Sequence, residues 1–269
     1  MNNERILLFI PAYNCEKQIT RVLAQLDDEI LSFVNEIILV NNRSTDGTEA
    51  AAAEYAREHP QIPLRLLRND ENYGLGGSHK VAFAYAVRHD FDYVIVLHGD
   101  DQGNIHDLLP VFKGGSYRKY DCCLGSRFKK GSRLEGYSAF RTFGNRVYNV
   151  LFAIATGRKI SDLGSGLNLY DTRILRDEFY IRFPDNLSFN YCMILAAAHY
   201  RHSAYFFPIT WREEDQVSNV KLMNQASYVL GMVIKYFFLR GRFIKTEFRG
   251  VSKREYTAKI IFENEVQGE

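Results

Sequence analysis

Four short apolar runs alternate with helix-like segments in the first hundred residues, and this alternation limits the possible folds more than any other feature. The runs are Arg5–Pro11, Glu36–Val40, Leu64–Leu67 and Tyr93–Leu97, and the segments with helical spacing are Glu16–Leu26, Thr48–Glu58 and Gly77–Arg88. Strands that are apolar throughout and separated by helices are typical of a parallel sheet covered on both faces. The sequence therefore predicts an α/β, Rossmann-like half with right-handed crossovers.

The second half of the chain is less regular. Its strand candidates are Cys122–Leu124, Leu167–Tyr170 and Tyr205–Ile209, and its helix candidates are Phe140–Thr156, Asn186–His199 and Lys221–Leu239. The sequence has no internal repeat and no linker rich in Pro, Ser or Gly. We therefore expect one domain over residues 1–220, followed at 221–269 by an amphipathic helix and a basic tail.

The composition excludes several functional classes. The chain has 269 residues, of which 46% are apolar and 25% are charged, so it can bury a large core and is not disordered. Its net charge of +2 provides no basic field, and we expect no nucleic-acid partner. The longest apolar run is shorter than the roughly 20 residues that span a bilayer, and the N-terminus does not resemble a signal peptide. These features predict a cytoplasmic protein.

Polar clusters follow all four strands of the first half, at Pro11–Asn14, Asn41–Thr48, Asn69–Gly77 and His98–Gln102. One such cluster can be a turn or a helix cap, but four at one edge of a parallel sheet indicate a ligand site. In the last cluster, alternate residues His98, Asp100 and Gln102 can face one point. Their donor types suit Mn²⁺ or Mg²⁺ that also binds diphosphate oxygens, although a turn with a hydrogen-bonded histidine would use the same residues.

The order and spacing of these motifs resemble the family-2 glycosyltransferases with a GT-A fold, and in particular the polyprenyl-phosphate branch typified by dolichyl-phosphate mannose synthase. The resemblance runs from Ile6 to Leu222. The matching segments are Pro11–Asn14, Val40–Thr48, Gly74–Gly76, His98–Gln102, Gly125–Arg127 with Arg141, Asp162–Gly166, Pro208–Trp211 and Ser218–Leu222. The resemblance implies a mostly parallel central sheet flanked by helices. It also implies inverting transfer of a sugar from a nucleotide-sugar to a polyprenyl-phosphate carrier.

The resemblance also implies roles for individual residues. His98, Asp100 and Gln102 would hold the divalent cation, and Arg127, Arg141 and Asn145 would bind the acceptor phosphate. The nucleotide-sugar would be bound by Pro11, Ala12, Tyr13, Asn41, Asn42, Gly74 and Asp100. One amide can meet both the N3–H donor and a carbonyl acceptor of uracil, so Asn42 favours a UDP-sugar over GDP-mannose.

The sequence departs from the family pattern at several positions. Asn41 and Asn42 stand where the family has two Asp residues, His98 replaces the first Asp of the metal motif, Asn72 replaces a Lys and Cys15 replaces a Glu. A neutral histidine favours Mn²⁺ over Mg²⁺. The missing acids also leave open a non-catalytic subunit that binds sugar nucleotides. A further alternative is transfer to a hydroxyl of a glycan or glycolipid, for which Asp101 is the candidate base.

Lys221–Leu239 combines an apolar face with a basic segment that follows it at residues 240–254. This pattern predicts an interfacial helix on the cytoplasmic face of a membrane that contains anionic lipids. The apolar face consists of Leu222, Ala226, Val229, Leu230, Val233, Tyr236 and Phe237. The same face would suit a core helix or a subunit interface, so a homo-oligomer or a membrane-anchoring partner is the alternative.

Overall fold

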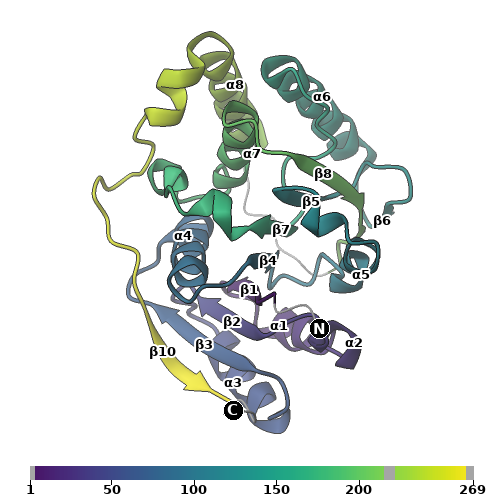
Figure 1. Cartoon of the computed structure of the whole chain (residues 1–269), viewed down its shortest axis with the longest axis vertical. Helices are drawn as coiled ribbons and strands as arrows, with labels where there is room; N and C mark the ends of the chain where they lie inside the picture. The colour runs from purple at the N-terminus through teal and green to yellow at the C-terminus, as the bar shows by residue number, and fades with distance from the viewer. Residues whose placement is uncertain (1–3, 215–221, 265–269) are drawn as a thin grey trace.

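The computed structural model describes residues 4–214 and 222–264, and its main element is an eight-stranded sheet of order β10-β3-β2-β1-β4-β7-β5-β8 (Figure 1). The strands are β1 (Ile6–Ala12), β2 (Glu36–Asn41), β3 (Leu64–Asn69), β4 (Tyr93–Leu97), β5 (Cys122–Ser126), β7 (Leu167–Asp171), β8 (Ala204–Pro208) and β10 (Ala258–Glu263). Strands β3, β2, β1 and β4 are parallel, and β7 and β10 are antiparallel to their neighbours. A second sheet pairs β6 (Arg133–Glu135) with β9 (Thr210–Arg212).

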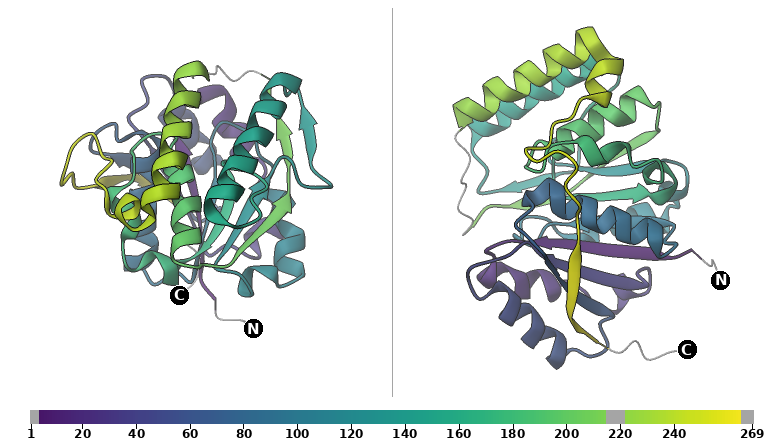
Figure 2. Two further views of the ribbon diagram at one scale, coloured as in Figure 1. Left: turned by 90° about the horizontal axis from the view of Figure 1, so that it is seen from above. Right: turned by 90° about the vertical axis from the view of Figure 1, so that its left-hand side faces the viewer.

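Helices cover both faces of the main sheet, as Figure 2 shows. The α-helices are α1 (Glu16–Leu23), α2 (Asp28–Leu31), α3 (Thr48–Glu58), α4 (Gly74–Arg88), α5 (Leu109–Lys113), α6 (Ala139–Thr156), α7 (Phe189–His199) and α8 (Leu222–Lys245). Short 3₁₀ helices occur at Ile105–Leu108, Ser116–Arg118, Thr172–Leu175 and Phe179–Arg182. One apolar cluster joins the sheet to α1, α3 and α5, and the other joins it to α4, α6, α7 and α8. The predicted α/β class, with a mostly parallel sheet flanked by helices, is confirmed.

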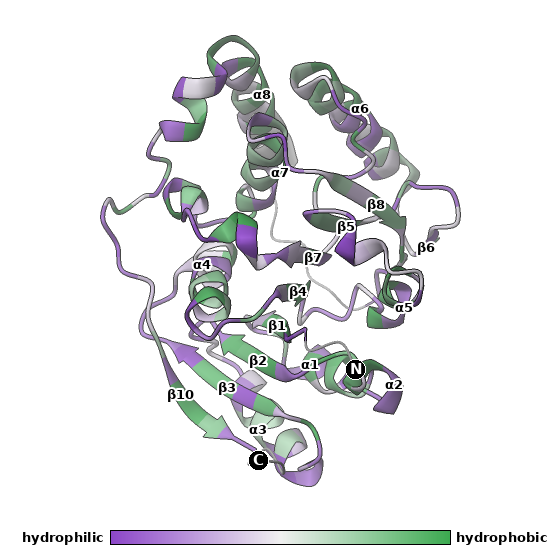
Figure 3. Ribbon diagram, viewed as in Figure 1, coloured by the Kyte–Doolittle hydropathy of each residue, from purple (hydrophilic) through white to green (hydrophobic). Residues whose placement is uncertain are grey.

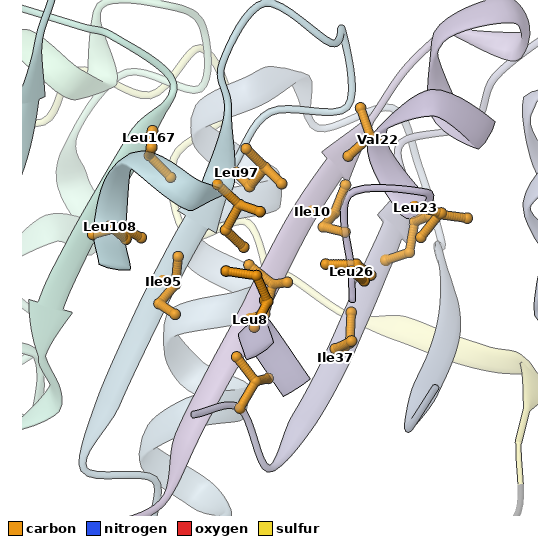
Figure 4. Packing of buried hydrophobic residues seen from close by; sticks show 14 of the residues in the cluster. Leu8, Ile10, Val22, Leu23, Leu26, Ile37, Ile95, Leu97, Leu108 and Leu167 are labelled. Atoms are coloured by element: carbon orange, nitrogen blue, oxygen red, sulfur yellow. The ribbon is translucent and has the colours of Figure 1, made fainter. Parts of the chain in front are cut away.

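Strand β1 lies in the middle of the sheet and is buried along its whole length. Alternate side chains of a strand point to opposite faces. Leu8 and Ile10 therefore pack with α1 in the first cluster (Figure 4), and Leu7 and Phe9 pack in the second. This two-sided burial explains why the run is apolar at every position.

The main difference from the sequence-based prediction lies at the C-terminus. The tail was expected to be a basic appendage, but β10 pairs antiparallel with β3 and completes the edge of the sheet. Its side chains are mostly exposed, so no apolar run marks it as a strand. The other element boundaries differ from the predicted ones by a few residues. The predicted boundary at residue 220 lies outside the described residues, and the two-part division stays a prediction.

Lys80 of α4 connects the C-terminal segment to the rest of the fold. Its side chain is fully buried, and Nζ donates to Phe183 O at 2.6 Å, to Asp185 Oδ1 at 2.6 Å and to Tyr256 OH at 3.1 Å. Burial lowers the pKa of Lys80 to about 8, and Asp185 opposes that shift. The segment around Asp185 therefore packs against the start of α4, where Gly76 N donates to Asp185 O at 2.7 Å.

The face of α8 that was predicted to be interfacial is partly a core face. Val229, Val233 and Tyr236 are buried in the second cluster, while Leu230 and Phe237 are exposed. The side chains of Leu222 and Ala226 lie outside the described part of the chain. The helix continues to Lys245, with non-helical backbone at Leu239. No helix within residues 4–214 and 222–264 is long and apolar enough to cross a membrane.

Replacing Lys80 by Met is expected to lower the free energy of unfolding by about 3 kcal/mol, because it removes the closer of the two cations that pair with Asp185 and the buried donor to Phe183 O. Urea denaturation measures the change. The control is Lys113→Met, which breaks an exposed pair with Glu29 and should cost less than about 1 kcal/mol. Equal losses in the two variants would contradict the anchoring role of Lys80.

Candidate active site

A pocket of about 260 Å³ opens at the carboxyl ends of β1, β2 and β4 and is closed on one side by the start of α4. Its lining residues are Pro11, Ala12, Tyr13, Cys15, Asn42, Asn72, Gly74, Leu75, Ser78, His98, Gly99, Asp100 and Leu187. It thus brings together residues from all four polar clusters that the sequence places after the strands. Six of the seven residues predicted to bind the nucleotide-sugar line it, and Asn41 does not.

Asn41 forms a turn beside the pocket. Its Oδ1 accepts from Ser44 N at 2.9 Å, and its Nδ2 donates to Glu49 Oε2 at 2.6 Å. Glu49 is also paired with Arg68. Both ends of the Asn41 amide are therefore used in holding the loop between β2 and α3.

Asn42 holds the loop that leads into α4. Its Oδ1 accepts from Asn69 Nδ2 at 3.0 Å and from Tyr73 N at 2.8 Å, and its Nδ2 donates to Asn72 Oδ1 at 2.8 Å. The amide oxygen already has two donors, so a nucleotide base could meet only the remaining N–H of Asn42. The exposed Asn72 also lines the pocket, but its Oδ1 accepts from Asn42 Nδ2 and from Gly74 N at 3.0 Å, so only its Nδ2 could meet a base.

His98 and Asp100 form the inner end of the pocket. Burial lowers the pKa of His98 to about 4, so the ring is neutral near pH 7. Its Nε2 is buried and has no hydrogen-bond partner among the described residues. Gly166 has a φ of +68°, and a Cβ there would lie 2.9 Å from Cγ of the His98 ring, which explains the glycine at this position.

His98 and Asp100 fit a divalent cation that takes most of its ligands from a bound diphosphate and from water. A neutral imidazole with a free nitrogen and the carboxylate of Asp100 are donors that Mn²⁺ accepts, and the amide oxygen of Gln102 is a further candidate. Within the described ranges, no three His, Cys, Asp or Glu residues form a ready-made metal cluster. Phosphate oxygens and water would therefore complete the coordination, as is common for hard cations at phosphate sites.

Asp101 lies outside the pocket lining, although it is adjacent to Asp100 in sequence. It has a φ of +58° and is buried. Its carboxylate accepts from Arg21 Nε at 2.7 Å, from Gln25 Nε2 at 3.0 Å and from Arg212 Nη2 at 3.2 Å. Both oxygens are thus engaged with Arg21 of α1, with Gln25 just after that helix and with Arg212 of β9, which is a structural role and not the arrangement expected of a general base.

The three residues predicted to bind the acceptor phosphate meet around Tyr137. Asn145 Nδ2 donates to Tyr137 OH at 2.6 Å and Arg127 Nη1 donates to the same oxygen at 3.3 Å. The guanidinium of Arg141 lies over the Tyr137 ring, 4.7 Å from its centroid. Because the phenol oxygen accepts twice, its own O–H can still donate. Tyr137 was not singled out from the sequence, where its only mark is its position directly after the glycine-containing loop Lys129–Gly136.

Each of the two arginines also has a carboxylate partner. Arg127 is buried, and its Nε and Nη2 donate to Asp162 at 2.8 and 2.7 Å, so the first residue of the D-x-x-S-G motif holds it in place. Arg141 Nη1 donates to both oxygens of Glu213 at 2.8 and 2.6 Å. No described residue accepts from Nε or Nη2 of Arg141, and its side chain is 32% exposed. This outer edge of Arg141 is free to meet an anion.

Glu213 connects the two parts of the site. It holds Arg141, and its charge adds to the burial of Asp100, which is the main cause of the raised pKa of that carboxyl. Sequence reasoning missed Glu213 because it directly follows β9. That strand has only three residues, so no apolar run in the sequence marks it as the edge of a sheet. The motif Ser218–Leu222 that follows it begins outside the described residues.

The sequence profile described as Glycosyl transferase family 2 matches residues 8–179, a range that includes most of β1, the elements from α1 to β7 and all four polar clusters after the strands. The chain belongs to glycosyl transferase family 2. The enzyme class implied by the resemblance is therefore confirmed.

Curated relatives and solved structures agree with this assignment. An undecaprenyl-phosphate mannosyltransferase of Micrococcus luteus is 24% identical over 172 residues, which cover 64% of this chain and 68% of the relative. A dolichyl-phosphate beta-glucosyltransferase of Trichomonas vaginalis is 26% identical over 245 residues, covering 86% and 71%. The glucosyl-3-phosphoglycerate synthase of Mycobacterium tuberculosis, solved with Mn²⁺, UDP and phosphoglyceric acid, superposes with a TM-score of 0.60 at 15% identity, covering 98% and 88%. This last likeness confirms the GT-A fold.

Replacing Asp100 by Asn is expected to stabilise the protein in a pH-dependent way. Burial, together with the charges of Asp101 and Glu213, raises the pKa of Asp100 to about 6. An unfolded aspartate ionises near pH 3.9, so ionisation favours the unfolded state and stability is lost as the pH rises from about 4 to about 6. The Asn variant avoids that loss and should be more stable by about 3 kcal/mol above about pH 7, with little advantage near pH 4.

Urea denaturation at the two pH values measures this difference. Asp46→Asn is the control with the opposite sign, because hydrogen bonds from Thr48 and the backbone outweigh desolvation and lower the pKa of Asp46. A pH-independent gain in Asp100→Asn would contradict the assignment of a desolvated carboxylate with a raised pKa at the pocket.

Proposed function

We propose that this protein is an inverting, metal-dependent glycosyltransferase that moves a sugar from a nucleotide-sugar to a polyprenyl phosphate. The contacts of Asn42 remove the reason for favouring a UDP-sugar over GDP-mannose, so the donor is decided by the assay below. The observation that carries the proposal is the cluster of Arg127, Arg141 and Asn145 around Tyr137, which Glu213 connects to Asp100 of the pocket through its charge. Relatives that act on undecaprenyl phosphate and dolichyl phosphate support the same acceptor class.

The pocket would bind the donor. The nucleoside would lie against Pro11, Ala12 and Tyr13, and the diphosphate would extend toward Asp100. His98, Asp100 and Gln102 would hold Mn²⁺ or Mg²⁺, which supplies positive charge to the leaving diphosphate. Asn42 keeps the start of α4 at the pocket wall, so its contribution to the donor site is to shape it and to present Asn72.

The acceptor cluster suits a phosphate monoester. Such a group is already anionic near neutral pH, so its oxygen can attack the anomeric carbon without a general base while the bond to the nucleoside diphosphate breaks. It needs positioning, and a guanidinium edge matches phosphate oxygens with two parallel hydrogen bonds. The free edge of Arg141 and the O–H of Tyr137 provide those donors. Asp101, which would serve a hydroxyl acceptor, is held by Arg21 and Arg212.

The acceptor class implies a place at a membrane surface. We propose that the protein works as a peripheral protein on the cytoplasmic face, where nucleotide-sugars are available to it. A second copy of the chain or a membrane-anchoring partner could strengthen the attachment. No nucleic acid is expected as a partner, because the charge of the chain is balanced.

The first test is an assay of the purified protein with Mn²⁺, a short-chain polyprenyl phosphate in mixed micelles and a panel of UDP- and GDP-sugars. A charged lipid product from one donor is the expected result. Nucleotide binding without any product would support the alternative of a non-catalytic subunit that binds sugar nucleotides. Transfer to a glycan hydroxyl that is lost in Asp101→Asn would support the alternative of a hydroxyl acceptor with Asp101 as base.

Tyr137→Phe is expected to raise the KM for the lipid phosphate about tenfold with little change in the KM for the donor, because one hydrogen bond to a charged group is lost. Arg141→Ala should reduce kcat/KM for the lipid phosphate by more than about tenfold, and Arg127→Ala should abolish turnover. Arg176→Ala, an exposed arginine outside the site, is the control and should change neither value. A raised KM for the nucleotide-sugar in Tyr137→Phe, with an unchanged KM for the lipid phosphate, would contradict the placement of Tyr137 in the acceptor cluster.

A further inference from the structure

Helix α6 exposes a continuous apolar stripe on the side away from the sheet. Phe140, Phe143, Val147, Val150 and Ile154 are 77, 67, 41, 58 and 62% exposed. Their spacing of three and four residues places them on one face of the helix, over a length of about 21 Å. An uninterrupted exposed stripe of this kind marks an interaction surface.

Helix α8 extends this surface. It packs beside α6, and Arg240 Nη2 donates to Ala155 O at 2.9 Å, which joins the C-terminal ends of the two helices (Figure 2). Its outward side exposes Tyr228, Leu230, Ile234, Phe237, Phe238 and Leu239. Apolar residues run along both helices in Figure 3. Among the described residues, 11 of the 17 exposed large hydrophobic side chains belong to α6 and α8, so the exposed apolar area is concentrated at this end of the molecule.

The charges on the same two helices are all positive. Arg146, Lys235, Arg240, Arg242 and Lys245 are exposed, and neither helix contains Asp or Glu. The whole chain is nearly neutral, with 34 basic and 32 acidic residues, so this imbalance is local. An apolar face bordered by cations fits the surface of a bilayer that contains anionic lipids.

We propose that the outward faces of α6 and α8 form a single docking surface that lies flat in the headgroup region of an anionic membrane. A second copy of this chain is a poorer occupant, because a two-fold contact would bring like charges of both copies together. The inference deepens the proposed function and rests on it only for the choice of lipid as the occupant. It differs from the sequence-based expectation in two ways: α6 contributes the longer stripe, and the participating face of α8 excludes Val229, Val233 and Tyr236.

The surface places the acceptor cluster at the membrane. Arg141 and Asn145 lie on α6, each one or two positions from Phe140, Phe143 and Val147 of the stripe. With about 100° of rotation per residue, Arg141 and Asn145 point roughly 140° and 180° away from the middle of the stripe, so they face the domain while the stripe faces the lipid. Because an α-helix is only about 10 Å across, a lipid phosphate bound at Arg141 would lie one helix diameter from the bilayer, and its polyprenyl chain could pass around the edge of α6.

Vesicle flotation tests the proposal with the full chain and vesicles of phosphatidylcholine with or without phosphatidylglycerol. The wild type should float with the anionic vesicles, and added salt should weaken binding. The double variants Phe140→Ser/Phe143→Ser and Phe237→Ser/Phe238→Ser should each partition at least about tenfold less, since burying one phenylalanine in an apolar phase already provides about 1.5 kcal/mol or more. The matched control is Tyr200→Ser/Val251→Ser, which removes exposed apolar side chains from other elements and should float like the wild type.

Undiminished flotation of both double variants would overturn the proposal. A lipid-free dimer in analytical ultracentrifugation that dissociates in Phe140→Ser/Phe143→Ser would also overturn it, in favour of a second copy. Circular dichroism and nucleotide binding confirm that the variants are folded. If the wild type floats but transfers no sugar to any lipid phosphate, the proposed function is wrong and the proposed membrane-docking surface is still supported. If it glycosylates a soluble short-chain acceptor but does not float, the surface fails and the function stands.

Discussion

The burial of β1 on both faces is the constraint from which the site follows. A strand that is apolar at every position needs a helical layer on each side and hydrogen-bonded neighbours on both edges, and β2 and β4 meet that need in parallel. Parallel strands end at one edge, so the loops after β1, β2 and β4 converge there. The pocket that we propose for the donor occupies this edge, and no separate element is needed to form it.

The second half of the chain forms the proposed acceptor site through polar contacts. Asp162 fixes Arg127, Glu213 fixes Arg141, and the Tyr137 hydroxyl joins Arg127 to Asn145. These contacts connect β5, the loop before β7, the end of β9 and α6. The same helix α6 carries the exposed apolar stripe, so the proposed phosphate site and the proposed lipid surface share one rigid element. The asparagines that replace family acids have structural uses here, since Asn41 and Asn42 hold the loops beside the pocket.

Much of the fold could be predicted from the sequence. The strands of the first half can be recognised in the sequence, because a strand that is buried on both faces requires an unbroken apolar run. Strand β10 gave no such signal, since an edge strand with exposed faces can have an ordinary polar composition. The face of α8 was assigned to lipid from its periodicity alone, and three of its residues are buried against the domain. Periodicity shows that a helix has an apolar face, but it cannot tell whether protein or lipid covers that face.

The sequence by itself determined the α/β class, the GT-A resemblance and most of the residues that line the pocket, because buried strands and the loops after them are local patterns. Only the tertiary structure decided which of the two adjacent aspartates faces the pocket. Asp100 lines it, whereas the positive φ of Asp101 turns its carboxylate toward Arg21 and Arg212. The structure alone also brought Tyr137 and Glu213 to the site. Such contacts join residues that are distant in the chain, and side-chain direction and long-range pairing leave no periodic trace in a single sequence.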